Sequence, residues 1–484
     1  MPVLPSQYDV TPPYELLREA EMGRIGFDHR LIRSLLDRPT ATSPALKRFA
    51  SEYREKKVLD LETQIFDLFR ALRTPDAIPF YFHLMQSGDD GIPDEIVEAF
   101  AELGAPAVDP LLERYRQLGL EDGADLAFLL AALGVRDQRI LDVLIETLDR
   151  DIYEGGISLG LYGDPAARPA VEAAMSRVTS PAERKALEDC LLQIDAPRTE
   201  ATHEPYDIWE EYPETALPEF DLLSAEDCLT FLDVNDPAYR REAALSFSGD
   251  GYSAAVRRKL MEHARGDEDE AVRAACLNAL GESLDDRNVV KLLLDTLNDT
   301  SKPLAERGGA LVGLARESKR PEVDRFIREF YANPQSRDDA LHAIVRSKDG
   351  RYKKQVLESL ESDNLDFRSG AVAGVGALGL SEAAGQLRAM FEDEDLRPMA
   401  LHVYAFVAPS RNTSKAIEQL YQDIEEMANG LTVEEGDLVG HALDSRLEKA
   451  GLPPVFFPDD EEIDESHDHS HDHGHHHGGP QTFH

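Results

Sequence analysis

A repeating arginine is the feature that most constrains the fold of this chain. Six arginines recur between residues 223 and 410, at successive intervals of 32, 34, 30, 31 and 29 residues: Arg241, Arg273, Arg307, Arg337, Arg368 and Arg397. A small residue follows each arginine after three positions and an aliphatic one after four. Seven positions on, the residue is apolar in every unit except the first, where it is Ser248. Such offsets lie on one face of an α-helix, and a period of about 30 residues is typical of stacked helical units.

The repeat predicts an all-α protein, an α-solenoid of stacked helical hairpins in two arrays. The expected domains are an N-terminal helical cap (1–74), a degenerate array (75–195), a linker rich in proline, aromatic and acidic residues (196–222), a regular array (223–451) and a disordered acidic and histidine-rich tail (452–484). In the degenerate array, Gly104, Gly134 and Gly163 recur where a helix is expected to end. The tail is too polar to bury a core.

The linker holds an unusual set of aromatic residues. Its prolines rule out a continuous helix, and it contains the only tryptophan, Trp209, close to Tyr206, Tyr212 and Phe220. Two interpretations are open: these side chains dock on a partner, or they fold back on the chain's own helices. We favour the second, because an exposed aromatic cluster promotes aggregation.

The net charge of the chain limits the classes of partner that it can bind. Among 484 residues, 93 are Asp or Glu and 51 are Lys or Arg, which gives a formal net charge of −42. Such a surface repels phosphate backbones and anionic lipid headgroups, so the sequence argues against nucleic-acid and membrane binding. It favours a protein partner with basic segments, which we expect on the concave face of the solenoid.

The cysteines indicate the compartment. Cys190, Cys228 and Cys276 are widely spaced and odd in number, which argues against a disulfide framework and favours a reducing environment. Neither a signal peptide nor an apolar run long enough to span a membrane is visible. We therefore expect a cytoplasmic protein.

The units resemble HEAT repeats, in the short form found in proteins similar to phycobilin lyases. The resemblance rests on DEDEAVRAACLNALGESLDD (267–286) and DFRSGAVAGVGALGLSEAAGQL (366–387). In the first segment an acidic turn, an apolar residue and an arginine open the second helix of the unit, as Asp269, Val272 and Arg273. The resemblance implies a ladder of contacts between each arginine and turn carboxylates of neighbouring units. The ladder is not expected in the first array, where other residues hold the arginine position: Ile96, Leu126 and Gly155.

The last eighteen residues carry the clearest chemical signal, because they contain eight of the fifteen histidines, interleaved with aspartates. Neutral imidazole binds Zn²⁺, Ni²⁺, Co²⁺ and Cu²⁺, and carboxylates add oxygen ligands. The candidate metal ligands are His467, Asp468, His469, His471, Asp472, His473, His475, His476 and His477. The tail resembles the histidine-rich tails of metallochaperones and metal transporters, which implies metal handling. A solvated low-complexity tail without a metal role in the cell stays open as the alternative.

The arrays themselves show no recognisable catalytic motif. The three histidines of the second array, His263, His342 and His402, are isolated in sequence and expected on ordinary helix faces. The sequence therefore favours a non-enzymatic scaffold for protein–protein interaction, which requires no cofactor and has a tail able to bind Zn, Ni, Co or Cu ions. The alternatives are a metal storage or metallochaperone-type protein and, from the family resemblance alone, a phycobilin lyase-like enzyme.

Overall fold

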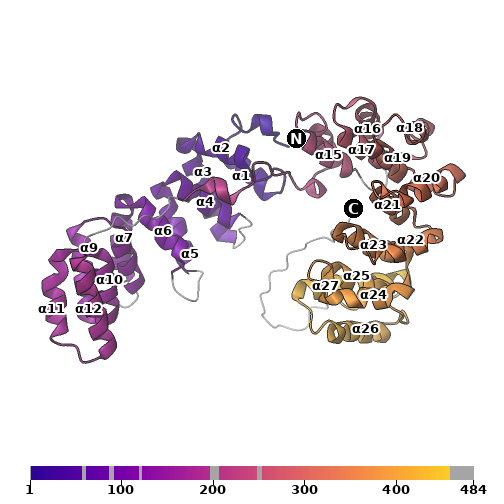
Figure 1. Ribbon diagram of the computed structural model, residues 1–484. Coiled ribbons are helices and arrows are strands. Elements are labelled where there is room, and N and C mark those ends of the chain that lie inside the picture. The colour runs from indigo at the N-terminus through magenta and orange to yellow at the C-terminus, as the bar shows by residue number, and fades with distance from the viewer. Residues whose placement is uncertain are drawn as a thin grey trace, which may run out of the picture. The chain divides into compact units, whose positions relative to one another are not determined.

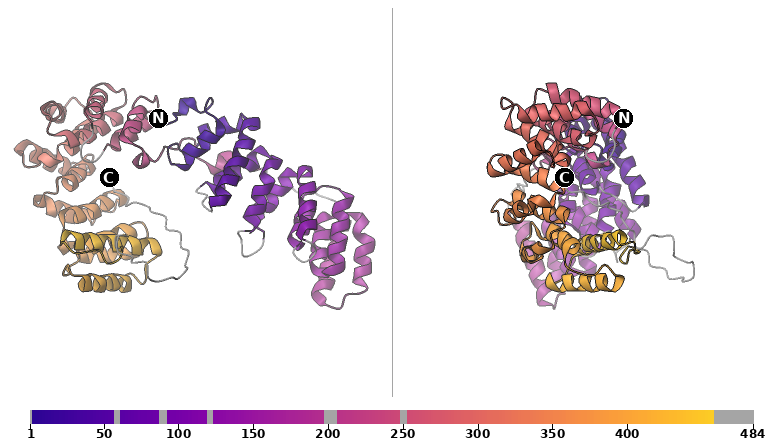
Figure 2. Two further views of the ribbon diagram at one scale, coloured as in Figure 1. Left: turned by 180° about the vertical axis from the view of Figure 1, so that it is seen from behind. Right: turned by 90° about the vertical axis from the view of Figure 1, so that its right-hand side faces the viewer.

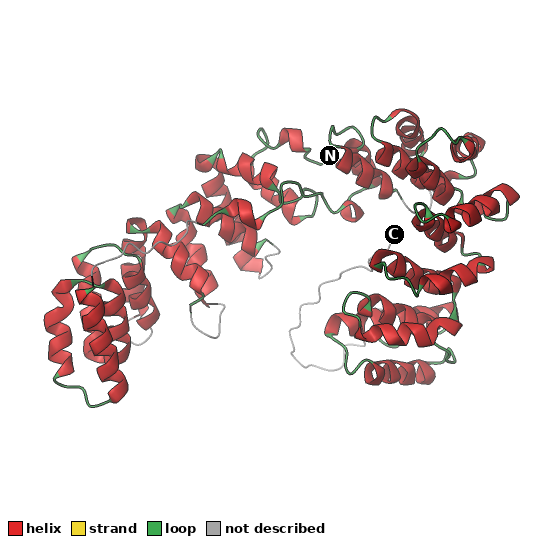
Figure 3. Cartoon of the chain, viewed as in Figure 1, coloured by secondary structure: helices red, strands yellow, loops and turns green. Residues whose placement is uncertain are grey.

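The protein is built from helices and loops. The computed structural model describes residues 2–56, 61–86, 92–118, 123–196, 206–247 and 253–457. Within these ranges it contains α-helices and short 3-10 helices and no strand, so the all-α prediction is confirmed (Figure 3). No helix in the same ranges is long and apolar enough to cross a membrane.

The helices fall into two compact units, Met1–Asp227 and Cys228–His484. The first contains α1 (Pro13–Glu21), α2 (His29–Leu36), α3 (Pro39–Lys56), α4 (Glu62–Leu72), α5 (Ile78–Gln86), α6 (Asp94–Leu103), α7 (Ala105–Leu118), α8 (Ala124–Ala132), α9 (Gln138–Arg150), α10 (Ile152–Tyr162), α11 (Arg168–Met175), α12 (Pro181–Asp195) and α13 (Ile208–Glu211). Helix α14 (Ala225–Phe231) spans the boundary. The second contains α15 (Pro237–Leu245), α16 (Ala254–Gly266), α17 (Glu270–Ala279), α18 (Arg287–Asn298), α19 (Leu304–Gly313), α20 (Pro321–Ala332), α21 (Arg337–Ser347), α22 (Lys353–Ser359), α23 (Leu365–Leu378), α24 (Ala384–Ala389), α25 (Arg397–Val407), α26 (Ser414–Met427) and α27 (Val433–Lys449).

Each unit is a stack of helical pairs (Figures 1 and 2). In the second unit the odd-numbered helices from α15 to α27 pack on one another in sequence, and each even-numbered helix packs on the odd-numbered helix that follows it. In the first unit α6, α8, α10 and α12 form one row, and α7, α9 and α11 form the other. A single pair exposes its apolar face, and the pair next to it covers that face. The stacked hairpins predicted from the repeat are therefore confirmed.

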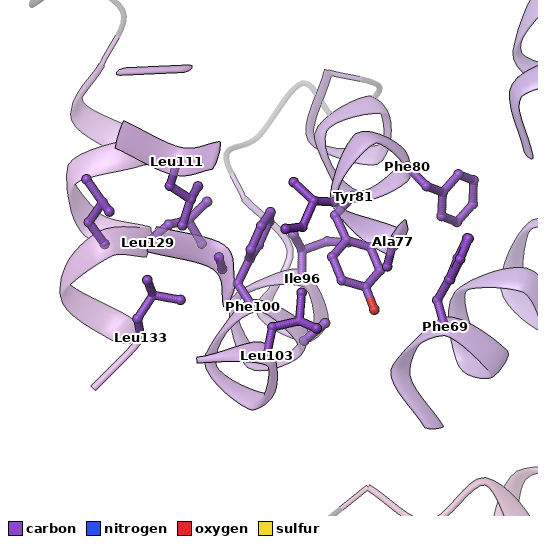
Figure 4. Packing of buried hydrophobic residues seen from close by; sticks show 14 of the residues in the cluster. Phe69, Ala77, Phe80, Tyr81, Ile96, Phe100, Leu103, Leu111, Leu129 and Leu133 are labelled. Carbon is purple, nitrogen blue, oxygen red and sulfur yellow. The ribbon is translucent and has the colours of Figure 1, made fainter. Parts of the chain in front are cut away.

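Aromatic side chains fill the centre of the first unit. Tyr81 from α5 packs edge-on against Phe100 from α6, with ring centroids 5.4 Å apart. Phe69 from α4 lies 5.8 Å from Phe80 of α5 by the same measure (Figure 4). One continuous cluster of buried side chains joins these residues to both the N-terminal helices and the row of stacked pairs. Burial of this cluster stabilises the cap and the first array together.

Residues 206–222 fold back on the N-terminal helices, as the sequence favoured. The carbonyl oxygen of Trp209 lies 2.9 Å from His29 Nε2, and the hydroxyl of Tyr212 donates to a carboxylate oxygen of Asp67 at 2.5 Å. Both aromatic side chains pack against the core of the first unit. This segment is thus part of the first unit, and its aromatic rings are shared with the unit's core.

Glycines end three helices of the first unit where the sequence predicts it. Gly104, Gly134 and Gly163 have φ angles of 62°, 69° and 60°, and they follow α6, α8 and α10. A side chain with a β-carbon is strained in this left-handed conformation, which explains the choice of glycine.

The repeated arginines tie helices together. In four repeats the guanidinium group donates to the carbonyl oxygen six residues earlier: Arg240 to Val234 at 2.9 Å, Arg273 to Asp267 at 2.5 Å, Arg337 to Tyr331 at 2.9 Å and Arg397 to Phe391 at 2.8 Å. Four of the repeat arginines form an ion pair with a carboxylate further along the chain. These pairs are Arg240 with Asp267 at 2.8 Å, Arg273 with Glu306 at 2.7 Å, Arg368 with Asp393 at 2.9 Å and Arg397 with Glu435 at 2.6 Å. Each of these arginines therefore links neighbouring helices with charge-assisted hydrogen bonds.

The first arginine of the repeat is Arg240, so the prediction of Arg241 is wrong by one position. The side chain of Arg240 is 7% exposed, whereas that of Arg241 is 54% exposed and lies 3.5 Å from a carboxylate oxygen of its neighbour Glu242. Counting from Arg240 places the buried Phe247 seven positions on, and the exception at Ser248 disappears. The two arginines are adjacent and both precede small residues, so the pattern alone did not separate them.

The first unit also has ion pairs between neighbouring helical pairs, although other residues occupy the arginine position of the repeat there. Arg136 lies 3.0 Å from a carboxylate oxygen of Asp164 and donates to the carbonyl oxygen of Tyr162 at 3.0 Å. Arg70 pairs with Glu102 at 2.9 Å. Arg136 lies in the loop between α8 and α9, and Arg70 lies near the end of α4. Neither occupies the arginine position of the repeat, so the pattern did not reveal them.

Residues 452–457, predicted as the start of the disordered tail, pack against α27. The buried carboxylate of Asp444 accepts hydrogen bonds from the backbone N–H groups of Val455, Phe456 and Phe457, at 2.7 to 3.2 Å. A buried carboxylate satisfied by three donors holds this segment in place. We call residues 452–457 the C-terminal strap.

Candidate functional site

The candidate metal ligands of the tail lie outside the described residues. This holds for all nine of them: His467, Asp468, His469, His471, Asp472, His473, His475, His476 and His477. In the ranges that the structure does describe, no group of three or more His, Cys, Asp or Glu side chains could hold a metal ion. Metal binding by the tail therefore stays a prediction.

One of the three array histidines is part of a charged cluster. His263 Nδ1 lies 2.8 Å from a carboxylate oxygen of Asp267, one helical turn further along the chain. His263 lies on α16, as the sequence predicts, and its ring contacts the carboxylate that follows the end of this helix. A His and an Asp four residues apart share one face of a helix, and this spacing was the signal in the sequence. His402 lies on α25, with Nδ1 3.2 Å from the carbonyl oxygen of Leu438.

Arg240, His263 and Asp267 line an open cleft of about 510 Å³ in the second unit. Arg240 holds the carboxylate through two hydrogen bonds, from Nε at 2.9 Å and from Nη2 at 2.8 Å. Burial raises the pKa of Asp267, but hydrogen bonds from Arg240, the backbone of Asp269 and His263 outweigh it and lower the pKa to about 2. The carboxylate is therefore ionised at neutral pH, and the cluster suits a structural clamp between two repeats.

A buried thiol lies near this clamp. Burial raises the pKa of Cys276, and the carboxylate of Asp267 raises it further. The thiol is therefore protonated at neutral pH, and a thiol in that state is a poor nucleophile. Cys276 serves core packing, in keeping with its small-residue position in the repeat.

The most distinctive surface of the described chain is an apolar stripe on α10 and α12. Tyr153, Ile157 and Leu161 recur every fourth residue of α10 and are 46%, 38% and 46% exposed. Leu192 on the adjoining helix α12 is 68% exposed. These four residues, which we call the α10–α12 stripe, account for much of the large apolar side-chain exposure in the first unit. The three residues of α10 share one face of the helix, and exposed apolar side chains grouped on one face mark interaction sites more often than scattered ones.

Glycines explain why α10 exposes these side chains. A β-carbon on Gly155 would lie 2.3 Å from Cα of Leu148 in α9, and one on Gly156 would meet Ala186 of α12 at 3.5 Å. The glycine side of α10 is therefore pressed against its neighbours. Ile157, two residues after Gly155, lies on the opposite side of the helix and is partly exposed there.

Acidic residues surround the α10–α12 stripe. Leu192 stands three or four residues from acidic positions on α12 in both directions, and Ile157 stands three residues after another on α10. These acidic neighbours are Glu154, Glu188, Asp189 and Asp195. Lys185 pairs with Asp189 and Arg168 pairs with Asp195, so Glu154 and Glu188 are left to carry the negative charge of the rim. The stripe therefore combines an apolar surface with a negative rim.

Comparisons with known proteins add no assignment: no model of a protein family matches the chain, and no curated protein shows significant similarity to it.

The clamp generates a prediction that separates two adjacent arginines. Replacing Arg240 with methionine leaves a buried carboxylate without its main partner, so we expect the free energy of unfolding at pH 7 to fall by about 3 kcal/mol. Replacing Arg241 with methionine serves as the matched control. Its side chain is exposed, so we expect a change below about 0.5 kcal/mol. Urea denaturation followed by circular dichroism measures both.

The pH dependence of the same variants checks the cause. The pKa of Asp267 in the folded protein, about 2, lies below the usual 3.8. The stabilisation of the folded protein by the Arg240–Asp267 pair is therefore complete above about pH 4 and is lost as the pH falls toward 2. The difference between wild type and the Arg240 variant is expected to shrink over this interval. A difference that stays constant with pH would show that Arg240 acts through packing alone.

Proposed function

We propose that the protein is a non-enzymatic scaffold whose first unit binds the basic amphipathic helix of a partner protein. The observation that carries this proposal is the α10–α12 stripe with its acidic rim. Apolar residues spaced by four along one helix, together with an exposed leucine on the adjoining helix, match the way an amphipathic helix lies along a helical surface. Burying one such side chain fully contributes roughly 1.5–3 kcal/mol.

The charge of the rim selects the partner. Glu154 and Glu188, which flank the stripe on α10 and α12, would face the polar side of a helix that laid its apolar side on the stripe. Opposite charges at the edge of an interface increase the rate of association and exclude partners of like charge. A partner helix with Lys or Arg flanking its apolar face fits both features, and the overall charge of −42 acts in the same direction.

The stacked pairs and the arginine contacts support membership in the HEAT-like class, which the resemblance implies. All three cysteines are buried and free of disulfides, which supports a location in a reducing compartment such as the cytoplasm. Repeat stacks offer long surfaces for partners, and the proposed function uses one of them.

Two helical peptides of about five turns test the docking proposal. They share one apolar face, and their polar faces carry lysine in one and glutamate in the other. We expect fluorescence anisotropy to show the basic peptide binding at least about tenfold more tightly, or ~1.4 kcal/mol. Leu192→Glu and Leu161→Glu are expected to remove this binding, because each places a charge in the apolar contact.

Val10→Glu is the matched control, because Val10 is a solitary exposed apolar residue of the same unit, at 81% exposure. This variant should bind the basic peptide as wild type does. Equal binding of both peptides, or binding by the Leu192 variant that matches wild type, would contradict the proposal.

Metal binding by the tail is the second candidate function, favoured by the eight histidines among the last eighteen residues. Deletion of residues 466–484 is expected to abolish the heat of Ni²⁺ or Zn²⁺ binding in calorimetry. The reason is that no other group of potential ligands is present in the described part of the chain. Stoichiometric binding retained by the shortened protein would place the metal elsewhere.

A further inference from the structure

The end of the second unit contains a second hollow, outside the docking surface proposed above. It has a volume of about 410 Å³ and lies between α26, the first turn of α27 and the C-terminal strap. Three aromatic side chains line it, Tyr421, Phe456 and Phe457, and two carboxylates, Glu425 and Asp437, stand among the lining residues. We call this hollow the strap pocket.

The aromatic wall is held in a defined arrangement. The rings of Tyr421 and Phe456 stack with centroids 4.8 Å apart and an interplanar angle of 28°. The ring of Phe457 stacks on His441 with centroids 4.0 Å apart. The carboxylate of Asp444 fixes the backbone of both phenylalanines through their N–H groups. Rings supported in this way are pre-organised, so a ligand would not have to order them.

Two glycines of α27 leave the space that the rings occupy. A β-carbon on Gly440 would lie 2.8 Å from the ring of Phe457, and one on Gly436 would lie 2.8 Å from the hydroxyl oxygen of Tyr421. Their spacing of four residues places both on one face of the helix. The strap and Tyr421 can therefore lie close against α27.

The charged side chains that line the pocket are both acidic. Burial raises the pKa of Tyr421, and the carboxylates of Glu425 and Asp437 raise it further. A field that opposes a phenolate favours a cation. None of the lining residues is Lys or Arg. The capping box of α27 occupies the N–H groups of Thr432 and Glu435, which leaves fewer donors for an anion.

We propose that the strap pocket binds a quaternary ammonium group, as in choline or a trimethylated lysine side chain. Aromatic faces attract such cations through their quadrupole, and methyl groups gain contact with the rings. The carboxylates of Glu425 and Asp437 add attraction at the rim. An unmodified ammonium group holds its water more tightly and finds few acceptors among the aromatic rings, so the pocket favours the alkylated cation.

Calorimetry on the full chain tests this with four probes: choline, its neutral isostere 3,3-dimethylbutanol, N-acetyl-trimethyllysine amide and N-acetyl-lysine amide. We expect each quaternary probe to bind at least about tenfold more tightly than its counterpart. Tighter binding of choline indicates a small-molecule ligand, and tighter binding of the trimethyllysine probe indicates a modified protein partner.

Variants locate the site. Phe457→Ala removes one wall at the partly exposed end of the strap, and Asp437→Asn removes one carboxylate without changing its shape. Both are expected to weaken choline binding at least about fivefold while the thermal unfolding curve shows that the protein is folded. Val10→Ala, at an exposed residue outside both proposed binding surfaces, should leave choline binding unchanged. Equal binding of choline and 3,3-dimethylbutanol, no choline binding, or full binding by both pocket variants would overturn the proposal.

Discussion

The close approach of neighbouring helix backbones is the constraint on which the second unit depends. A β-carbon on Gly309 of α19 would lie 2.2 Å from the carbonyl oxygen of Ala274 in α17. One on Gly313 would lie 2.4 Å from the carbonyl oxygen of Leu277. Neither position has room for a larger residue without a shift of backbone. Helices this close gain dispersion contacts along their length, and the odd-numbered helices become one row. The repeat arginines then link each helical pair to the next through ion pairs.

The sequence predicted this architecture because helical repeats express packing directly as periodicity. A small residue three positions after the arginine, an aliphatic one after four and an apolar one after seven describe a helix face that meets another helix. The repeat pattern could not distinguish Arg240 from Arg241. The guanidinium group of Arg240 is buried because it pairs with Asp267, which lies in a later turn of the chain. Likewise, the sequence did not predict the hydrogen bonds between Asp444 and the C-terminal strap, because a single acidic residue in a helix forms no recognisable pattern.

The candidate surfaces were harder to predict than the fold, for a physical reason. Helix α10 is apolar on its exposed face as well as on its buried one, so its hydrophobic pattern does not show which face meets solvent. Only packing shows that the glycines face inward and Ile157 outward. The strap pocket combines α26 and α27 with residues that the sequence predicts to belong to the disordered tail. Both surfaces place carboxylates beside apolar or aromatic side chains, so the two proposals share a preference for cationic partners. The proposed partner is a helix in the first unit and an alkylated ammonium group in the second.

The central claim, that backbone contact between neighbouring helices supports the stack, is tested most directly by hydrogen exchange in two glycine variants. Gly309→Ala adds a β-carbon where none fits, and Gly385→Ala adds one inside α24, where no atom lies within 4 Å. Overpacking costs about 1–3 kcal/mol, while alanine in an open helical position stabilises by up to about 1 kcal/mol. The account predicts that Gly309→Ala accelerates amide exchange in α17, α19 and α21 together and that Gly385→Ala does not. Exchange that rises only within α19, or equally in both variants, would contradict it.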